Sequence, residues 1–133
     1  MKILVKALSV KQPHANLIAY GPKRIETRTW ATRYRGPLLI CSSKVPRVEP
    51  AGRAVAIAWL ETCRPMTEAD EEAACCGAYP QAVAWCLVEV ESVAKPFRVR
   101  GQQGLFAVAI ESDSQVGRYV ERMMAARTEG GDP

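Results

Sequence analysis

Apolar runs of strand length recur along this chain, and most of the segments between them are too short or too irregular to hold a helix. The runs cover residues 3–10, 25–30, 38–41, 54–63, 83–93 and 104–110, and helical patterns cover residues 13–20, 68–75 and 115–127. Parallel sheets need a crossover of a dozen or more residues, usually a helix, between successive strands. We expect Pro96 to end the fifth run, because proline cannot donate to a ladder. The pattern favours an α+β fold, a small, mostly antiparallel β-barrel of about five or six strands with short flanking helices, over a doubly wound sheet.

Length and composition fit one globular domain. The 133 residues can bury one core and are too few for two, and 48% apolar with 24% charged residues is typical of a soluble protein. No apolar run is long enough to cross a membrane, and Lys6 interrupts the N-terminal run before it could form the apolar region of a secretory signal. We therefore expect no membrane partner and a cytoplasmic location.

Charge is distributed unevenly along the chain. Residues 1–53 hold eleven cations and two carboxylates, whereas residues 54–133 hold seven cations and twelve carboxylates. A positive field from the first part would concentrate ligands that carry phosphate. The alternative is that the two parts fold against each other and neutralise their charges in space.

Cysteine and histidine are poorly placed for a metal site. The five cysteines, at positions 41, 63, 75, 76 and 86, form no Cys-x-x-Cys pair, and His14 is the single histidine. Structural zinc requires four such ligands. We expect no metal and no cofactor, and we interpret Cys41 and Cys86, which lie in apolar runs, as reduced structural residues.

The segment from residue 21 to residue 44 concentrates polar chemistry. It holds six cations, two aromatic residues and a single carboxylate, Glu26. Residues 25–30 alternate as a strand, which puts Glu26, Arg28 and Trp30 on one face and threonines on the other. Polar residues on both faces indicate a strand that lines a cleft.

Such a cleft supports two kinds of chemistry. In an enzyme, Lys23 acts as a base because nearby cations disfavour its ammonium form, or a Lys23–Glu26 pair activates water while Arg28 stabilises an oxyanion. Lys23, Glu26 and Arg28 are therefore the candidate catalytic residues. In a binding protein, the cations contact phosphates and an aromatic side chain stacks on an unpaired base. The candidates for those contacts are Arg28, Trp30, Arg33, Tyr34, Arg35, Lys44 and Arg47.

Purely structural roles are the alternative for several of these residues. Trp30 would then be a rim residue packed on the first helix. Residues 34–37, Tyr-Arg-Gly-Pro, form a turn in which Gly36 adopts a positive φ and Arg35 pairs with Glu26.

Residues 7–44, ALSVKQPHANLIAYGPKRIETRTWATRYRGPLLICSSK, resemble the signature of the ASCH domain family. The shared elements are Leu-Ser-x-x-Gln-Pro, Gly-x-Lys-x-x-Glu-x-Arg-x-Trp, Tyr-Arg-Gly-Pro-Leu-Leu-Ile and a closing Ser-Lys. A Gly-x-x-Gly-Leu-Phe turn at residues 101–106 resembles the end of the family pattern. The resemblance covers roughly residues 7–110 and implies a PUA-like β-barrel over residues 1–112. The residues beyond it predict a helix at 113–128 packed on the barrel, from its apolar spacing, and a disordered tail at 129–133, from its two glycines.

The same resemblance implies a ligand. The family's barrel is related to RNA-binding PUA domains, so RNA or a modified nucleoside is the expected partner, with Gln12, Ser42, Ser43 and Lys44 at the rim of the cleft. His14 stands where many relatives carry tryptophan. A third possibility, a protein-interaction module, rests on the C-terminal helix and the acidic half.

An amidohydrolase is the alternative within the family. Some small bacterial ASCH proteins remove the acyl group of N4-acetylcytidine, and a Lys, a Thr three residues later and a Glu are proposed to act. Lys23 matches that lysine, but Glu26 occupies the threonine position, so the pattern is only partly matched. A carboxylate of the acidic helix could also reach the cleft, and the candidates are Glu68, Asp70, Glu71 and Glu72.

Overall fold

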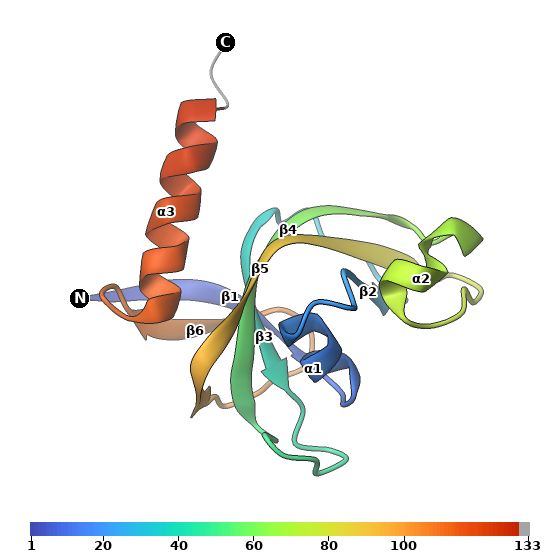
Figure 1. The fold of residues 1–133 in the computed structure, drawn as a ribbon, viewed down its shortest axis with the longest axis horizontal. Helices are drawn as coiled ribbons and strands as arrows, with labels where there is room; N and C mark the ends of the chain where they lie inside the picture. Colours follow the sequence, from blue (N-terminus) through green and yellow to red (C-terminus); the bar gives the residue numbers. More distant parts are fainter. Residues whose placement is uncertain (131–133) are drawn as a thin grey trace.

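Six strands form one mixed sheet in the order β2-β5-β4-β3-β1-β6. The computed structural model describes residues 1–130 and is drawn in Figure 1. The strands are β1 (Lys2–Val10), β2 (Ile25–Arg28), β3 (Gly36–Ser42), β4 (Arg53–Pro65), β5 (Val83–Arg98) and β6 (Phe106–Glu111). The helices are α1 (His14–Ala19), the 3-10 turn η1 (Glu68–Asp70), α2 (Glu71–Ala74) and α3 (Gln115–Gly130). Every pair of neighbouring strands is antiparallel except β1 and β3. The expected α+β class is confirmed.

The two faces of the sheet are covered by different helices, which explains why all of β3 is buried. Leu39 and Cys41 point into a cluster with residues of α3, whereas Leu38 and Ile40 point into a second cluster with residues of α1. Because successive side chains of a strand point to opposite faces, β3 contributes residues to both clusters. A strand covered on both faces reads as a continuous apolar run, as this one does.

Strand β5 does not end before Pro96, so that prediction was wrong. The strand continues to Arg98, and its pairing with β4 shifts register so that Ala54 lies opposite Phe97 while Ala56 lies opposite Ser92. Pro96 falls within this irregularity. A missing N–H therefore costs the ladder little there, as is usual for proline at bulges.

Helix α3 packs on the sheet through its first half and then leaves it (Figure 1). Val116, Tyr119 and Met123 are buried in the core, and residues 124–128 are exposed. The helix runs to Gly130, so it includes two residues of the expected tail; residues 131–133 lie outside the described part. Within residues 1–130, no helix is both long and apolar enough to cross a membrane.

Candidate functional site

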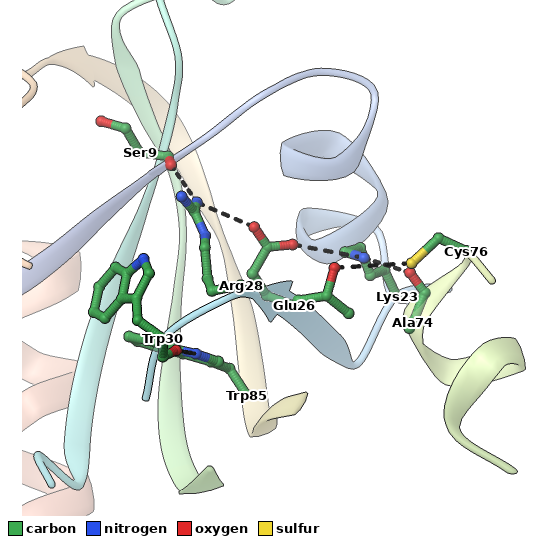
Figure 2. A network of polar contacts seen from close by, with 9 residues as sticks. Ser9, Lys23, Glu26, Arg28, Trp30, Ala74, Cys76 and Trp85 are labelled. Atoms are coloured by element: carbon green, nitrogen blue, oxygen red, sulfur yellow. Dashed lines mark hydrogen bonds and ion pairs between the residues drawn. The ribbon is translucent and has the colours of Figure 1, made fainter. Parts of the chain in front are cut away.

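Lys23, Glu26 and Arg28 converge where the connection after α1 enters β2 (Figure 2). The Lys23 Nζ lies 3.6 Å from the Glu26 Oε1, and the Arg28 Nη2 lies 3.1 Å from the Glu26 Oε2. Glu26 is paired with Trp85 across the β2–β5 ladder, so regular strand geometry fixes its place. One carboxylate thus serves two cations. Glu26 and Arg28 lie on one face of β2, and Lys23 joins them from the connection before the strand.

Lys23 lies on the buried side of this cluster. Its side chain is 1% exposed, and its Nζ donates a hydrogen bond to the carbonyl of Ala74 at the end of α2. The chain is also fixed at its backbone, because the Lys23 N–H donates to the carbonyl of Leu17. The lysine therefore ties α2 to β2. This carbonyl, rather than a carboxylate from the acidic helix, is what α2 contributes here.

The acidic segment makes its main ion pair elsewhere. Both oxygens of Asp70 accept hydrogen bonds from Arg64 at 2.7 and 2.8 Å, and Oδ2 also accepts one from the Thr67 backbone. The hydrogen bond from Arg64 is the largest of the effects that hold the pKa of Asp70 well below its usual range, and that from Thr67 follows. This pair stabilises the turn that leads into α2.

Arg28 is the partly exposed member of the charge cluster around Glu26. Its Nη2 donates to the backbone carbonyl of Ser9 at 2.6 Å and is ion-paired with Glu26, and its side chain is 25% exposed. Its Nε is buried and has no hydrogen-bond partner among the described residues. Two fixed acceptors orient the guanidinium. Arg28 is the member of the cluster that lines a pocket.

Trp30 stands beside Arg28 and is fixed by a second tryptophan (Figure 2). The rings of Trp30 and Trp85 meet edge to face, 4.9 Å apart with an interplanar angle of 83°. The indole N–H of the buried Trp85 donates to the carbonyl of Trp30 at 3.1 Å. Trp30 itself remains 36% exposed. The ring of Trp30 thus packs on Trp85 of β5. Packing on the first helix was the structural alternative that the sequence suggested.

A pocket of about 710 Å³ opens in front of Arg28 and Trp30, and we call it the Trp30 pocket. Its other lining residues are Ser9, Lys11, Ser43, Lys44, Val45, Gly101, Gln102, Gln103 and Gly104. A side chain at Gly101 would approach the Ser9 Oγ to 3.0 Å, so glycine lets this loop close against β1. The size is that of a small-molecule site. The sequence predicted a turn at residues 101–106 from its glycines, but it did not indicate that residues 101–104 line the pocket.

Gln12 and Ser42, expected at the rim of the cleft, do not line the Trp30 pocket, and their side chains bond to each other. The Gln12 Nε2 donates to the Ser42 Oγ and to the Asn16 Oδ1, each at 3.0 Å. Ser42 is 2% exposed. Ser43 and Lys44, the next two residues, do line the Trp30 pocket.

The turn before β3 holds Tyr34 and Arg35 away from the Trp30 pocket. The Tyr34 hydroxyl donates to the Pro37 carbonyl at 2.5 Å, and its ring lies over Gly36, whose φ is +143°. Arg35 donates to the Thr32 and Tyr34 carbonyls instead of pairing with Glu26. Burial raises the pKa of Tyr34. Arg33 is exposed in the same turn.

His14 lies near the buried end of the cluster. Burial lowers its pKa most, the charge of Lys23 lowers it further, and Glu26 acts in the opposite direction. Its Nδ1 is buried without a hydrogen-bond partner among the described residues. The imidazole is therefore neutral at pH 7. Within residues 1–130, no three His, Cys, Asp or Glu side chains are grouped to hold a metal ion.

Fold and site together define a small α+β domain that presents a basic pocket beside a half-exposed tryptophan. The sequence profile of the ASCH domain matches residues 8–97, more than half of the chain. The chain therefore belongs to the ASCH domain family. The matched region includes Arg28, Trp30 and Lys44 and ends before the 101–104 loop.

Solved structures of an ASCH protein from Zymomonas mobilis are similar in fold. One aligns with a TM-score of 0.62 at 15% identity, over 77% of this chain and 86% of that one. Two structures described as mutant forms of the same protein align with a TM-score of 0.58, at 13% and 14% identity. These two alignments cover 90% and 91% of this chain and 96% and 94% of the other. Comparison with curated proteins finds no match.

Proposed function

We propose that this ASCH domain binds single-stranded RNA and holds one unpaired base, standard or modified, in the Trp30 pocket. The observation that carries the proposal is the Trp30 indole, anchored by Trp85 and 36% exposed at the wall of a pocket that also presents Arg28. A fixed aromatic face loses little entropy when a base stacks on it, and base stacking is the usual basis of single-strand recognition.

The polar walls of the Trp30 pocket suit the rest of a nucleotide. Lys11, Arg28 and Lys44 supply positive charge, and the Gln102 and Gln103 side chains offer both donors and acceptors for a base edge. Arg28 cannot turn away without losing its bonds to Ser9 and Glu26. The pocket is therefore prepared for an anionic or polar planar ligand.

The charge asymmetry of the chain supports the same proposal. Among the side-chain ion pairs of the described residues, Lys2 with Glu111 joins the basic part to the acidic part, and the others lie within one part or the other. Direct pairing thus leaves most of the basic part unneutralised. A positive surface of this kind attracts nucleic acid and speeds its association.

Fluorescence anisotropy with a labelled 12-nucleotide single-stranded RNA of mixed sequence tests the proposal. Trp30→Ala should weaken binding about 5- to 150-fold, the equivalent of about 1–3 kcal/mol for one stacked base. Tyr79→Ala is the matched control, because Tyr79 is similarly exposed, at 39%, and does not line the pocket. Equal affinities of the two variants, or no binding by the wild type, would refute the proposal.

Hydrolysis of N4-acetylcytidine-type nucleosides is the second candidate. The convergence of Lys23 and Glu26 to 3.6 Å is the observation in its favour. However, Lys23 is almost completely buried, donates to Ala74 and does not line the Trp30 pocket. A base needs hydrogen-bond reach to the group it activates. Binding is therefore the better supported function, and the cytoplasmic location expected from the sequence is compatible with it.

A further inference from the structure

A second pocket, of about 610 Å³, lies next to the Trp30 pocket and is lined mainly by cations. We call it the Arg98 pocket. Its lining residues are Lys44, Arg47, Glu49, Ala51, Gly52, Arg53, Arg98, Val99 and Arg100. Three of its arginines come from the paired ends of β4 and β5 and from the residues just beyond, a part of the chain that the sequence reasoning did not assign to the site.

The positive charge of the Arg98 pocket is largely unpaired. Its single carboxylate, Glu49, lies 3.0 Å from Arg47, and both are exposed. Lys44, Arg98 and Arg100 make no ion pair within the part of the chain that the structure describes. The pocket therefore offers several cationic side chains to a ligand.

Two of these cations are held against each other by the sheet. Arg53 and Arg98 are direct partners across the β4–β5 ladder, so their side chains share a face. Like charges directly opposite in an antiparallel pair destabilise the sheet. The Arg53 Nη1 donates a hydrogen bond to the Pro96 carbonyl at 3.4 Å. Because a carbonyl carries no net charge, this bond does not neutralise either arginine. An anion between the two guanidinium groups would remove the repulsion.

The Arg98 pocket adjoins the Trp30 pocket. Lys44 lines both, and Arg100 in one is followed directly by Gly101 in the other. The stem of Lys44 packs closely on Gly52, where a Cβ would lie 3.1 Å from the lysine Cε. Gly52, with a φ of +72°, thus lets the lysine lie across the boundary.

We propose that the Arg98 pocket binds backbone phosphates of the RNA strand whose base occupies the Trp30 pocket. Arginine forks bind phosphate oxygens bidentately, and Lys44 adds a point charge between the two pockets. The inference rests on the proposed function and narrows its ligand, because a free nucleoside has no phosphate to fill the second pocket. The ligand class is a phosphodiester strand that extends past the bound base.

The salt dependence of binding tests this assignment. The logarithm of the binding constant of the labelled 12-nucleotide RNA is measured against the logarithm of salt concentration, where each phosphate contact on a single strand contributes about 0.7 to the slope. Arg98→Gln with Arg100→Gln should lower the slope by about 1.4. Arg24→Gln with Arg118→Gln removes the same charge from two exposed residues outside both pockets and should leave the slope near the wild-type value.

The outcomes separate the two proposals. If Trp30→Ala weakens RNA binding while the Arg98/Arg100 variant keeps the slope of its control, the phosphate assignment is overturned and the base pocket stands. If the wild type binds no RNA, the proposed function fails and the phosphate assignment fails with it. A second arm uses sodium pyrophosphate at matched ionic strength. If pyrophosphate raises the melting temperature of the wild type and not that of the Arg98/Arg100 variant, while the two proteins show the same salt slope for RNA, the pocket is assigned to a free anion instead.

Discussion

Neutralising Glu26 should destabilise the protein strongly, because this carboxylate is the counter-charge of a buried lysine. The side chains of Glu26 and Lys23 are 9% and 1% exposed. Glu26→Gln keeps the size of the side chain and removes its charge, so the buried Lys23 ammonium keeps its hydrogen bond to the Ala74 carbonyl but loses its counter-charge. Removing one member of a buried pair typically costs about 3–5 kcal/mol. With a urea dependence of about 2 kcal/mol per molar, the unfolding midpoint should fall by about 1.5–2.5 M.

Urea unfolding followed by circular dichroism measures this effect, and the chain offers a matched control. Glu49→Gln makes the same chemical change in an ion pair with Arg47 whose carboxylate is 65% exposed, so it should cost at most about 1 kcal/mol. Combining Lys23→Met with Glu26→Gln removes both buried charges. The double variant should be more stable than the sum of its single variants by about 1–3 kcal/mol. Equal midpoints for Glu26→Gln and Glu49→Gln would refute the reasoning.

Three further predictions follow from other contacts. Gly36→Ala should lower the free energy of unfolding by about 1–3 kcal/mol, because φ at Gly36 is +143° and a Cβ there would lie 2.8 Å from the Tyr34 hydroxyl. Gly77→Ala is the control, because its Cβ would meet only an ordinary contact, and thermal melts of the two variants measure the difference. Asp70→Asn should lower stability by about 1.5–3 kcal/mol at pH 7 and flatten its pH dependence in acid. The folded-state pKa of Asp70 is lowered, so its stabilisation is present above about pH 4 and lost as pH falls through the folded value, which urea midpoints at several pH values would show. Incubation with N4-acetylcytidine should release no cytidine that depends on Lys23, and chromatographic detection of release that Lys23→Ala abolishes would contradict the binding assignment.

The residues of β2 show how far sequence could predict the site. Period-two alternation placed Glu26, Arg28 and Trp30 on one face. Strand β2 holds the first two of these residues but ends at Arg28, so it is shorter than the expected 25–30 and Trp30 lies just beyond it. The partners of these residues come from distant elements: Ala74 lies 51 residues from Lys23, and Trp85 lies 55 residues from Trp30. No local pattern specifies such contacts. The burial of Lys23, on which our preference for binding over hydrolysis rests, is therefore visible only in the folded protein.

The Arg98 pocket was hidden from sequence for a related reason. Pro96 indicates a strand end when it is considered alone, but the register shift in β4 and β5 accommodates it and extends the strand to Arg98. That extension sets Arg98 opposite Arg53. The fold class was easier to predict from the sequence. Runs of strand length without regular helical crossovers argue against a doubly wound sheet, whichever strands pair with one another.

The three tryptophans allow a direct measurement of the central claim, that a base binds against Trp30. Their indole N–H signals can be followed by NMR while the 12-nucleotide RNA is added to the ¹⁵N-labelled protein. Trp59, which lies under Arg127 of α3 at 4.6 Å, lines neither pocket and serves as an internal reference. We predict that the Trp30 signal shifts with RNA, that the Trp85 signal shifts less, and that the Trp59 signal stays in place. A shift of Trp59 alone, or saturating RNA that leaves Trp30 unmoved, would contradict the account.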